Sequence, residues 1–248
     1  MKYLVSILLI AAVIASGCSN STPIPHPTSN QETSPSPSPS PNPNPNTNLN
    51  SDTDSSDNRR EDTVFLNKNI GWKAVYHFQG MSREDMELYT TSDGGESWKE
   101  IGDSLQVGST LPSGVKSGLT FVNEKEGWIT TNAPWQGKVG LYKTMDGGVT
   151  WSEQTVTVPD ELVNSQIYAY PPLILTKDQG ILITRPAENE HTLLYITIDG
   201  GQHWKSFLDD QKDQYVGIAW TLSESMATVK YAEKTWTLSM QNYGKWSL

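Results

Sequence analysis

Leu88-Tyr-Thr-Thr-Ser-Asp93-Gly-Gly95-Glu-Ser-Trp98 is followed in this chain by two close copies of itself. The copies are Leu141-Tyr-Lys-Thr-Met-Asp146-Gly-Gly148-Val-Thr-Trp151 and Leu194-Tyr-Ile-Thr-Ile-Asp199-Gly-Gly201-Gln-His-Trp204. Successive aspartates lie 53 residues apart. A constant period of this length indicates a repeat architecture, in which stacked units bury a continuous core.

A second shared element precedes each copy. It reads Phe65-Leu-Asn-Lys-Asn-Ile-Gly71-Trp72 in the first repeat, Phe121-Val-Asn-Glu-Lys-Glu-Gly127-Trp128 in the second and Ile174-Leu-Thr-Lys-Asp-Gln-Gly180-Ile181 in the third. The tail carries a degenerate fourth unit, with Gln241 in place of the aspartate and Tyr243 in place of the second glycine. We therefore expect about four units.

Each unit is predicted to contain four short strands. In the second repeat, Leu119-Thr-Phe-Val is apolar and β-prone, Trp128-Ile-Thr-Thr follows a turn, and Gly140 to Thr144 alternates into the Asp-Gly-Gly corner. Four strands in about 50 residues are typical of a propeller blade. The predicted fold is all-β: a β-propeller-like array of about four four-stranded blades spanning residues 61–248, as a small closed propeller or an open arc.

The Asp-Gly-Gly-x-x-Trp unit has the chemistry of a turn. The aspartate accepts hydrogen bonds from the amides that follow, the second glycine tolerates a positive φ, and the tryptophan packs over the hairpin. Repetition favours this structural role over a calcium site. The residues assigned to it are Asp93, Gly95, Trp98, Asp146, Gly148, Trp151, Asp199, Gly201 and Trp204.

The pattern Ser/Thr-x-Asp-x-Gly-x-x-Trp resembles the Asp-box, or bacterial neuraminidase repeat, of sialidases, sortilin-type receptors and other β-propellers. The longer unit is similar to repeats of the photosystem II stability/assembly factor family and its relatives in non-photosynthetic bacteria. The resemblance covers roughly residues 62–248. It implies a propeller fold and an assembly role, whereas the Asp-boxes themselves lie away from the ligand face.

The fourth blade is expected to lack an outer strand, because only Ser247 and Leu248 follow its last tryptophan. An exposed sheet edge favours unwanted pairing. We therefore expect the segment from Arg59 to Val64 to supply that strand and close a ring, with an open arc or pairing with another copy as alternatives.

The first 18 residues resemble a bacterial lipoprotein signal peptide. An apolar run of about 14 residues ends in Ala15-Ser16-Gly17-Cys18, and Cys18 is the only cysteine. Two or three acyl chains on Cys18 would anchor the chain stably. The alternative is an ordinary signal peptide with Cys18 as a bystander. Residues 19–60 hold nine of the 15 prolines among Ser and Asn, and are predicted to form a disordered tether.

Composition argues against several functions. Residues 61–248 carry 15 Lys and Arg against 24 Asp and Glu, so a nucleic-acid partner is not expected. A sialidase needs three arginines, and this part contains only Arg83 and Arg185. The histidines His77, His191 and His203 are scattered, without metal-ligand spacing. We expect no catalytic residues, metal or cofactor, although a glycosidase with two carboxylates stays open.

A binding face is expected on the rim opposite the Asp-Gly-Gly turns. Aromatic and arginine side chains on loops are common recognition anchors. The candidates are Phe78, Arg83, Trp135, Tyr168, Tyr170 and Arg185, with core packing as the alternative role of Trp135 and the tyrosines. The sequence thus predicts an exported, lipid-anchored, non-catalytic binding or assembly module with a protein partner. The alternative is a carbohydrate-binding or degenerate glycosidase-like propeller.

Overall fold

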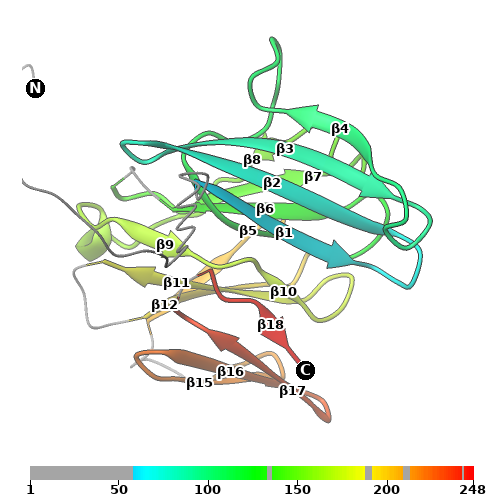
Figure 1. Cartoon of the computed structure of the whole chain (residues 1–248). Helices are drawn as coiled ribbons and strands as arrows, with labels where there is room; N and C mark the ends of the chain where they lie inside the picture. The colour runs from blue at the N-terminus through cyan, green and yellow to red at the C-terminus, as the bar shows by residue number, and fades with distance from the viewer. Residues whose placement is uncertain (1–57, 133–135, 188–191, 209–212, 242) are drawn as a thin grey trace, which may run out of the picture. The chain divides into compact units, whose positions relative to one another are not determined.

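The computed structural model describes residues 58–132, 136–187, 192–208, 213–241 and 243–248. Cys18, nearly all of the predicted tether and Trp135 lie outside these residues. The one helix among them is the three-residue 3-10 turn η1 (Asp160–Leu162), and no helix of the described residues is long and apolar enough to cross a membrane. The strands form four antiparallel sheets, so the predicted all-β array of about four blades is confirmed (Figure 1).

The sheets follow the repeats. The first contains β1 (Arg59–Phe65), β2 (Gly71–Gly80), β3 (Arg83–Thr91) and β4 (Lys99–Asp103). The second contains β5 (Val115–Phe121), β6 (Gly127–Asn132), β7 (Gly140–Thr144) and β8 (Ser152–Glu153). The third contains β9 (Ile167–Ala169), β10 (Leu173–Ile174), β11 (Gly180–Pro186), β12 (Leu193–Thr197) and β13 (Lys205–Leu208). The fourth contains β14 (Gln214–Tyr215), β15 (Ile218–Leu222), β16 (Met226–Tyr231), β17 (Lys234–Ser239) and β18 (Trp246–Ser247).

The expected closure of the fourth blade by the N-terminal strand is wrong. All seven residues of β1 pair with β2, from Arg59 opposite His77 to Phe65 opposite Gly71. The first repeat needs β1 as its own first strand, just as the second repeat uses β5. The short strand β18 completes the fourth sheet instead, pairing Thr237 with Ser247 and Leu238 with Trp246.

Each pair of successive sheets encloses its own apolar core. Strands present alternate residues to opposite faces, so a sheet between two others is buried on both sides. We call the face toward the preceding sheet the leading face and the other the trailing face. In the second sheet, Phe121 and Ile129 on the leading face pack with the first sheet, whereas Trp128 and Leu141 on the trailing face pack with the third.

The fourth sheet breaks this order because it is turned over. Its registers match Met226 and Ser239 to Gly71 and Thr91 of the first repeat, which puts Ala227 at the position of Trp72. Ala227 therefore belongs to the trailing face, yet it packs into the core shared with the third sheet. The list of fourth-sheet residues buried in that core is Ile218, Trp220, Ala227, Val229, Leu238 and Met240.

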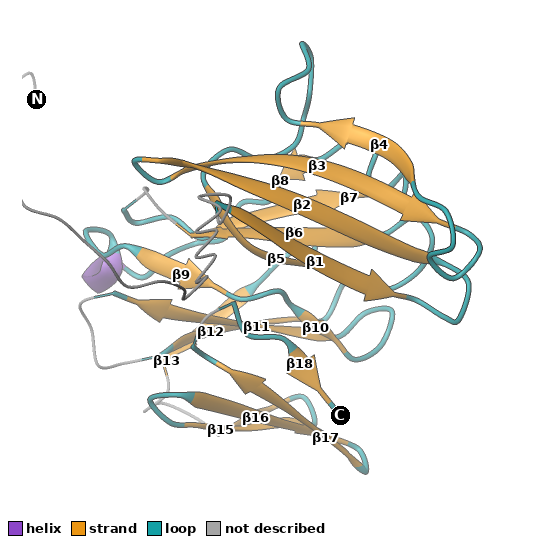
Figure 2. Cartoon of the chain, viewed as in Figure 1, coloured by secondary structure: helices purple, strands orange, loops and turns teal. Residues whose placement is uncertain are grey.

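Contacts at the sheet ends confirm the reversal. Gln179 lies in the turn before β11, at the same end as the Asp-Gly-Gly corner of the third sheet. Its amide donates to the carbonyl oxygen of Val216 at 3.0 Å and its Oε1 accepts from the Tyr231 hydroxyl at 2.6 Å, although both partners lie at the opposite end of the fourth repeat. In Figure 2 the arrow of β1 points right and that of β17 points to the upper left.

Candidate functional site

The three Asp-Gly-Gly corners are closed networks of hydrogen bonds. In the second repeat, Asp146 accepts from the backbone amide of Thr150 at 2.9 Å, from its hydroxyl at 2.6 Å and from the Thr144 hydroxyl at 2.8 Å. Thr144 in turn accepts from the amide of Gly148, whose φ is 102°. A glycine fits this backbone without strain. The carboxylate oxygens are thus used within the turn.

These bonds favour the ionised aspartates. Burial raises the pKa of Asp146, but hydrogen bonds from Thr150 and Thr144 outweigh it and hold the pKa below its usual range. In the first repeat, hydrogen bonds from Ser97 lower the pKa of Asp93. In the third, burial opposes but does not cancel the bonds from His203, and the pKa of Asp199 falls to about 2.

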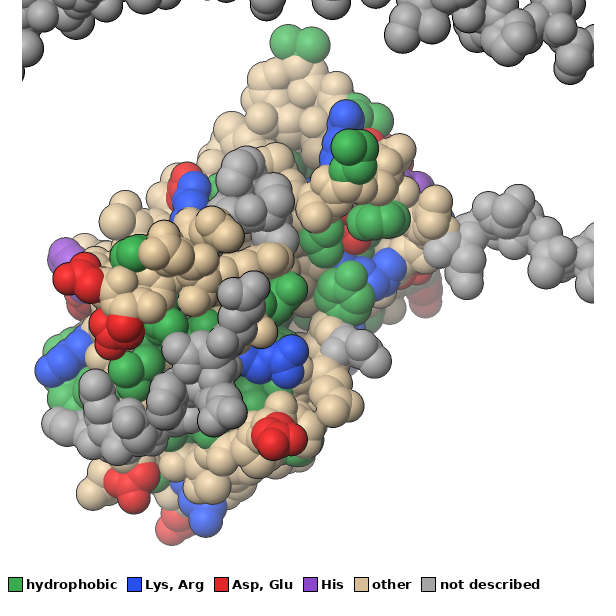
Figure 3. All heavy atoms as spheres, turned by 90° about the vertical axis from the view of Figure 1, so that its left-hand side faces the viewer, with side chains coloured by type: hydrophobic (Ala, Val, Ile, Leu, Met, Phe, Trp, Pro, Cys, Tyr) green, Lys and Arg blue, Asp and Glu red, His purple; other side chains and the backbone are tan. Residues whose placement is uncertain are grey.

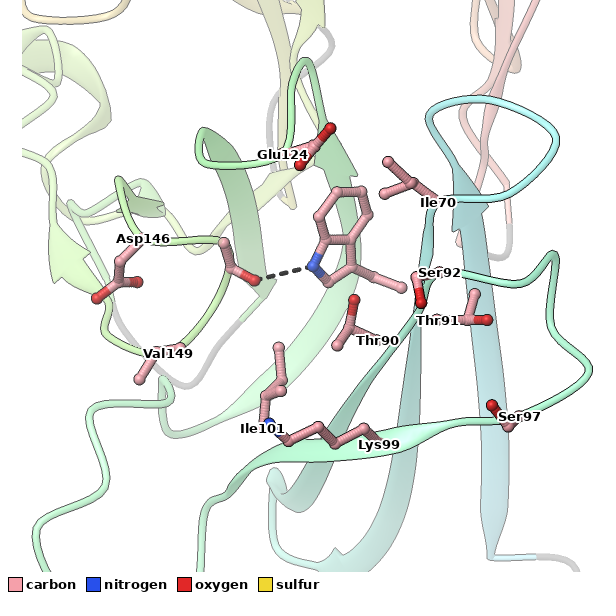
Figure 4. A pocket seen from close by; sticks show the side chains of 12 residues that line it. Ile70, Thr90, Thr91, Ser92, Ser97, Lys99, Ile101, Glu124, Asp146 and Val149 are labelled. Carbon is pink, nitrogen blue, oxygen red and sulfur yellow. Dashed lines mark hydrogen bonds between the residues drawn. The ribbon is translucent and has the colours of Figure 1, made fainter.

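The corners also connect neighbouring sheets. The Trp72 indole N–H donates to the carbonyl oxygen of Gly147 at 2.8 Å (Figure 4, dashed line). Between these sheets lies a depression of about 370 Å³, lined by Thr90, Thr91, Ser92, Ser97, Lys99, Glu124, Asp146 and Val149 among others. Its carboxylates include Asp146, whose lowered pKa is the opposite of what a general acid needs.

A larger hollow opens at the other end of the sheets. Its volume is about 620 Å³, and its described lining is Ser82, Val115, Ser117, Asn132, Gln166, Tyr168, Tyr170, Arg185, Met240, Gln241 and Tyr243. This lining includes one cation and three tyrosines, and the described residues in it include no acid. Figure 3 looks onto this end of the sheets, where hydrophobic side chains are exposed around basic ones.

Three of the predicted binding residues meet at this hollow. Tyr168 and Arg185 are cross-strand partners on β9 and β11. Arg185 is exposed and Tyr168 is half-buried, so both are within reach of a ligand. Tyr170 is buried in the core, and its hydroxyl donates to the carbonyl oxygen of Met240. Burial raises the pKa of Tyr170, which joins the third and fourth sheets more than it offers a free hydroxyl.

Phe78 and Arg83 lie on the neighbouring hairpin between β2 and β3. Phe78 is 44% exposed, and Nη2 of Arg83 lies 3.4 Å from Oδ1 of Asp85. Ser82 at the hairpin tip reaches the hollow, so this hairpin forms part of its margin. The tip residues Met81 and Ser82 adopt positive φ angles of 51° and 60°, which L-residues rarely do.

The sequence did not predict the wall that the reversed fourth sheet contributes, Met240, Gln241 and Tyr243. Tyr243 occupies the place of a turn glycine and keeps a positive φ of 57°. The centre of its ring lies 4.0 Å from the guanidinium carbon of Arg60. The centre of the Tyr76 ring lies 3.9 Å from the same carbon. The one sequence feature that could have indicated this wall is the aromatic residue Tyr243 at a position where the other repeats have glycine.

Charged side chains hold this wall in place. Arg60 donates to the carbonyl oxygen of Lys116 at 2.8 Å, and the Glu84 carboxylate accepts from the backbone amide of Lys116 at 2.8 Å. Lys245 forms an ion pair with Asp62. Burial lowers the pKa of Lys116 to about 8. The first and fourth sheets are therefore joined through charged side chains beside the hollow.

Comparison with known proteins gives backbone similarity only. No protein-family model and no curated protein matches the chain. A solved structure of YCF48 bound to D1 peptide is similar with 14% identity and a TM-score of 0.35, over 77% of this chain and 72% of that one. A GH74 xyloglucanase from Xanthomonas campestris shows 16% identity and a TM-score of 0.36, over 65% of this chain and 26% of the enzyme. A GH74 enzyme from Niastella koreensis shows 16% identity and a TM-score of 0.31, over 71% of this chain and 28% of the enzyme.

The described residues contain no group of three or more His, Cys, Asp or Glu side chains arranged to hold a metal ion. The candidate site is the hollow around Tyr168 and Arg185, because its lining offers the groups of a recognition site: aromatic faces, amides and one guanidinium.

Proposed function

We propose that this chain is an exported, lipid-anchored, non-catalytic module that binds a segment of an envelope or membrane protein in the hollow around Tyr168 and Arg185. The observation that carries the proposal is the pairing of these two side chains across β9 and β11 at the mouth of a 620 Å³ hollow. Tyrosine and arginine anchors dominate the energetics of many protein interfaces.

The polar groups of the hollow suit a polypeptide. The amides of Gln166 and Gln241 each offer a donor and an acceptor, which match the N–H and C=O groups of an extended backbone. Arg185 offers planar donors to a carboxylate or a carbonyl oxygen. Since the described lining residues include no acid, an acidic or polar segment is accommodated without like-charge repulsion.

The anchor part of the proposal rests on the Ala15-Ser16-Gly17-Cys18 sequence and the Pro-rich segment after it. An acylated Cys18 would fix the chain to a membrane, and residues 19–60 would hold the sheets away from the lipid surface. A binding site on such a tether reaches the exposed loops of neighbouring membrane proteins.

To test this proposal, one labelled sample of the protein is applied both to overlapping peptides of envelope membrane proteins and to a glycan array. We expect selective peptide binding that falls at least about tenfold in Tyr168→Ala/Arg185→Gln, with Lys230→Ala on the outer face of the fourth sheet as the matched control. Peptide binding that survives the double substitution contradicts the site. Binding to glycans alone supports the second candidate, a carbohydrate-binding head, which the tyrosine and amide lining also suits.

A further inference from the structure

The second and third repeats each receive a tryptophan of the preceding sheet beside their Asp-Gly-Gly corner. On the second sheet, the Trp72 indole stacks on Phe121 with ring centroids 3.8 Å apart and planes 3° from parallel. Trp151 meets Phe121 edge-on at 6.1 Å, and the Trp72 N–H donates to Gly147. On the third sheet, Trp128 lies against Gly201, and its exposed fraction is 1%.

The first sheet has counterparts of these residues, and among the described residues no sheet precedes it. Phe65 corresponds to Phe121 and Trp98 to Trp151, and their rings lie 6.1 Å apart. Phe65 is 49% exposed, whereas Phe121 is 9% exposed. The leading face of the first sheet therefore retains an aromatic slot of the kind that holds an indole elsewhere in this molecule.

One substitution distinguishes this face from its internal counterparts. Lys73 occupies the position of Ile129 and Leu182, both of which are fully buried. Its ammonium lies 4.9 Å from the Trp98 ring and 5.3 Å from the Tyr89 ring. A lysine here keeps the outer face soluble, as terminal repeats require, and leaves the Phe65 ring accessible.

The charges around the slot indicate the chemistry of a partner. The registers place five carboxylates on this face, against three fixed cations and one imidazole: Glu61, Asp85, Glu87, Glu100 and Asp103, with Arg59, Lys73, Arg83 and His77. Arg59 pairs with Glu61, Arg83 with Asp85 and His77 with Glu87. The carboxylates outnumber the cations on this face, and a basic surface complements that excess. The chain itself has a net charge of −10, which disfavours a second copy as the occupant.

Residues 19–57 contain no Phe, Trp or Tyr, so the predicted tether has no indole, phenol or phenyl ring to offer to the slot. We propose that the leading face of the first sheet is a docking site for a tryptophan of a basic partner protein. The indole stacks on Phe65, and its N–H donates to the backbone carbonyl of Gly94, the counterpart of Gly147. This site is separate from the hollow around Arg185, so either proposal can fail alone.

A lysine-flanked peptide with a single 5-fluorotryptophan tests the site, followed by fluorine NMR while the full chain is titrated. We expect saturable binding that weakens about two- to tenfold in Phe65→Ala and Phe65→Leu, the loss of an aromatic pair. Lys73→Ile, which restores the residue of the second repeat, should strengthen it. Met226→Ala, which shortens a 40% exposed apolar side chain on the fourth sheet, is the control and should bind like the unchanged protein.

Two probe variants keep the test independent of protein folding. A peptide with 1-methyltryptophan lacks the indole donor and should bind about three- to tenfold more weakly, the effect of one hydrogen bond. A peptide with alanine should not bind. Equal binding of the alanine peptide, no saturable binding to the unchanged chain, or competition by a soluble glycan would overturn the proposal. Self-association that Phe65→Ala abolishes would also overturn it, in favour of a second copy.

Discussion

The hydroxyl of Tyr231 donates a 2.6 Å hydrogen bond to Oε1 of Gln179, joining one end of the fourth sheet to the opposite end of the third. The Nε2 group of Gln179 donates to the carbonyl oxygen of Val216, so both the oxygen and the nitrogen of its side-chain amide bind the fourth sheet. This residue fixes the reversed orientation at one end, and the bond from Tyr170 to Met240 fixes it at the other.

Loss of either partner should loosen the fourth sheet. Gln179→Ala removes two hydrogen bonds and Tyr231→Phe removes one, so we expect the free energy of unfolding to fall by about 1 to 2 and about 1 kcal/mol respectively. Because they share a bond, the two effects should not add. Urea unfolding measures this, and hydrogen exchange should show the loss in β16 and β17. The exposed Thr235→Ala is the control; additive effects would contradict a shared bond.

Lys116 should make the stability of the protein rise with pH in the alkaline range. Burial lowers its pKa to about 8, below the usual value of about 10.4. Between these values the unfolded chain binds more protons at this site, so unfolding becomes less favourable as pH rises, by up to about 1.4 kcal/mol per pH unit. Urea unfolding at pH 8 and at pH 9.5 should show this rise in the unchanged chain but not in Lys116→Met.

The control for that experiment is Lys99→Met, which replaces an exposed lysine. It should keep the pH dependence of the unchanged chain. Parallel behaviour of Lys116→Met and the unchanged chain would mean that Lys116 titrates as an exposed side chain does.

The ionised side chain of Asp146 should stabilise the corner between β7 and β8. Asp146→Ala removes three hydrogen bonds from an exposed turn, and we expect a loss of roughly 1 to 2 kcal/mol at pH 7. Since the pKa is lowered in the folded chain, this contribution is present above the unfolded pKa of about 4 and disappears as pH falls further. Unfolding from pH 5 to 2.5 should be less pH-dependent in Asp146→Asn, and Asp160→Asn on η1 should not differ from the unchanged chain.

The proposed anchor predicts a change of location. Cys18→Ser removes the only thiol that could carry a lipid, so the protein should lose incorporated palmitate and leave the membrane fraction. Ser21→Ala, just beyond the motif, should behave as the unchanged chain. Retention of Cys18→Ser in membranes without palmitate would indicate an uncleaved signal segment in place of a lipid anchor.

The sequence was sufficient to predict the sheets because each repeat carries the residues that form its hairpins. Asp93, Asp146 and Asp199 set the corners, and the strands between them alternate. Alternation shows which residues share a face, but not which face meets the neighbour. The reversal of the fourth sheet was therefore hidden, and the expected role of β1 in that sheet was wrong.

The same limit applied to the hollow. Tyr168 and Arg185 were accessible to prediction because both lie on one rim within one repeat. The wall from Met240 to Tyr243 comes from a sheet whose orientation the pattern does not specify. Tyr170 belongs to the rim in sequence but reaches into the core, where its ring fills space between two sheets.

The reversed fourth sheet also limits how such a chain can grow by gene duplication. A unit inserted between the second and third repeats would find a trailing face on one side and a leading face on the other, as its neighbours do now. A unit added after the fourth would meet a leading face, because the trailing face of the fourth sheet already packs on the third sheet. Length variation among descendants of this architecture should therefore come from units inserted before Gln214, where the fourth sheet begins.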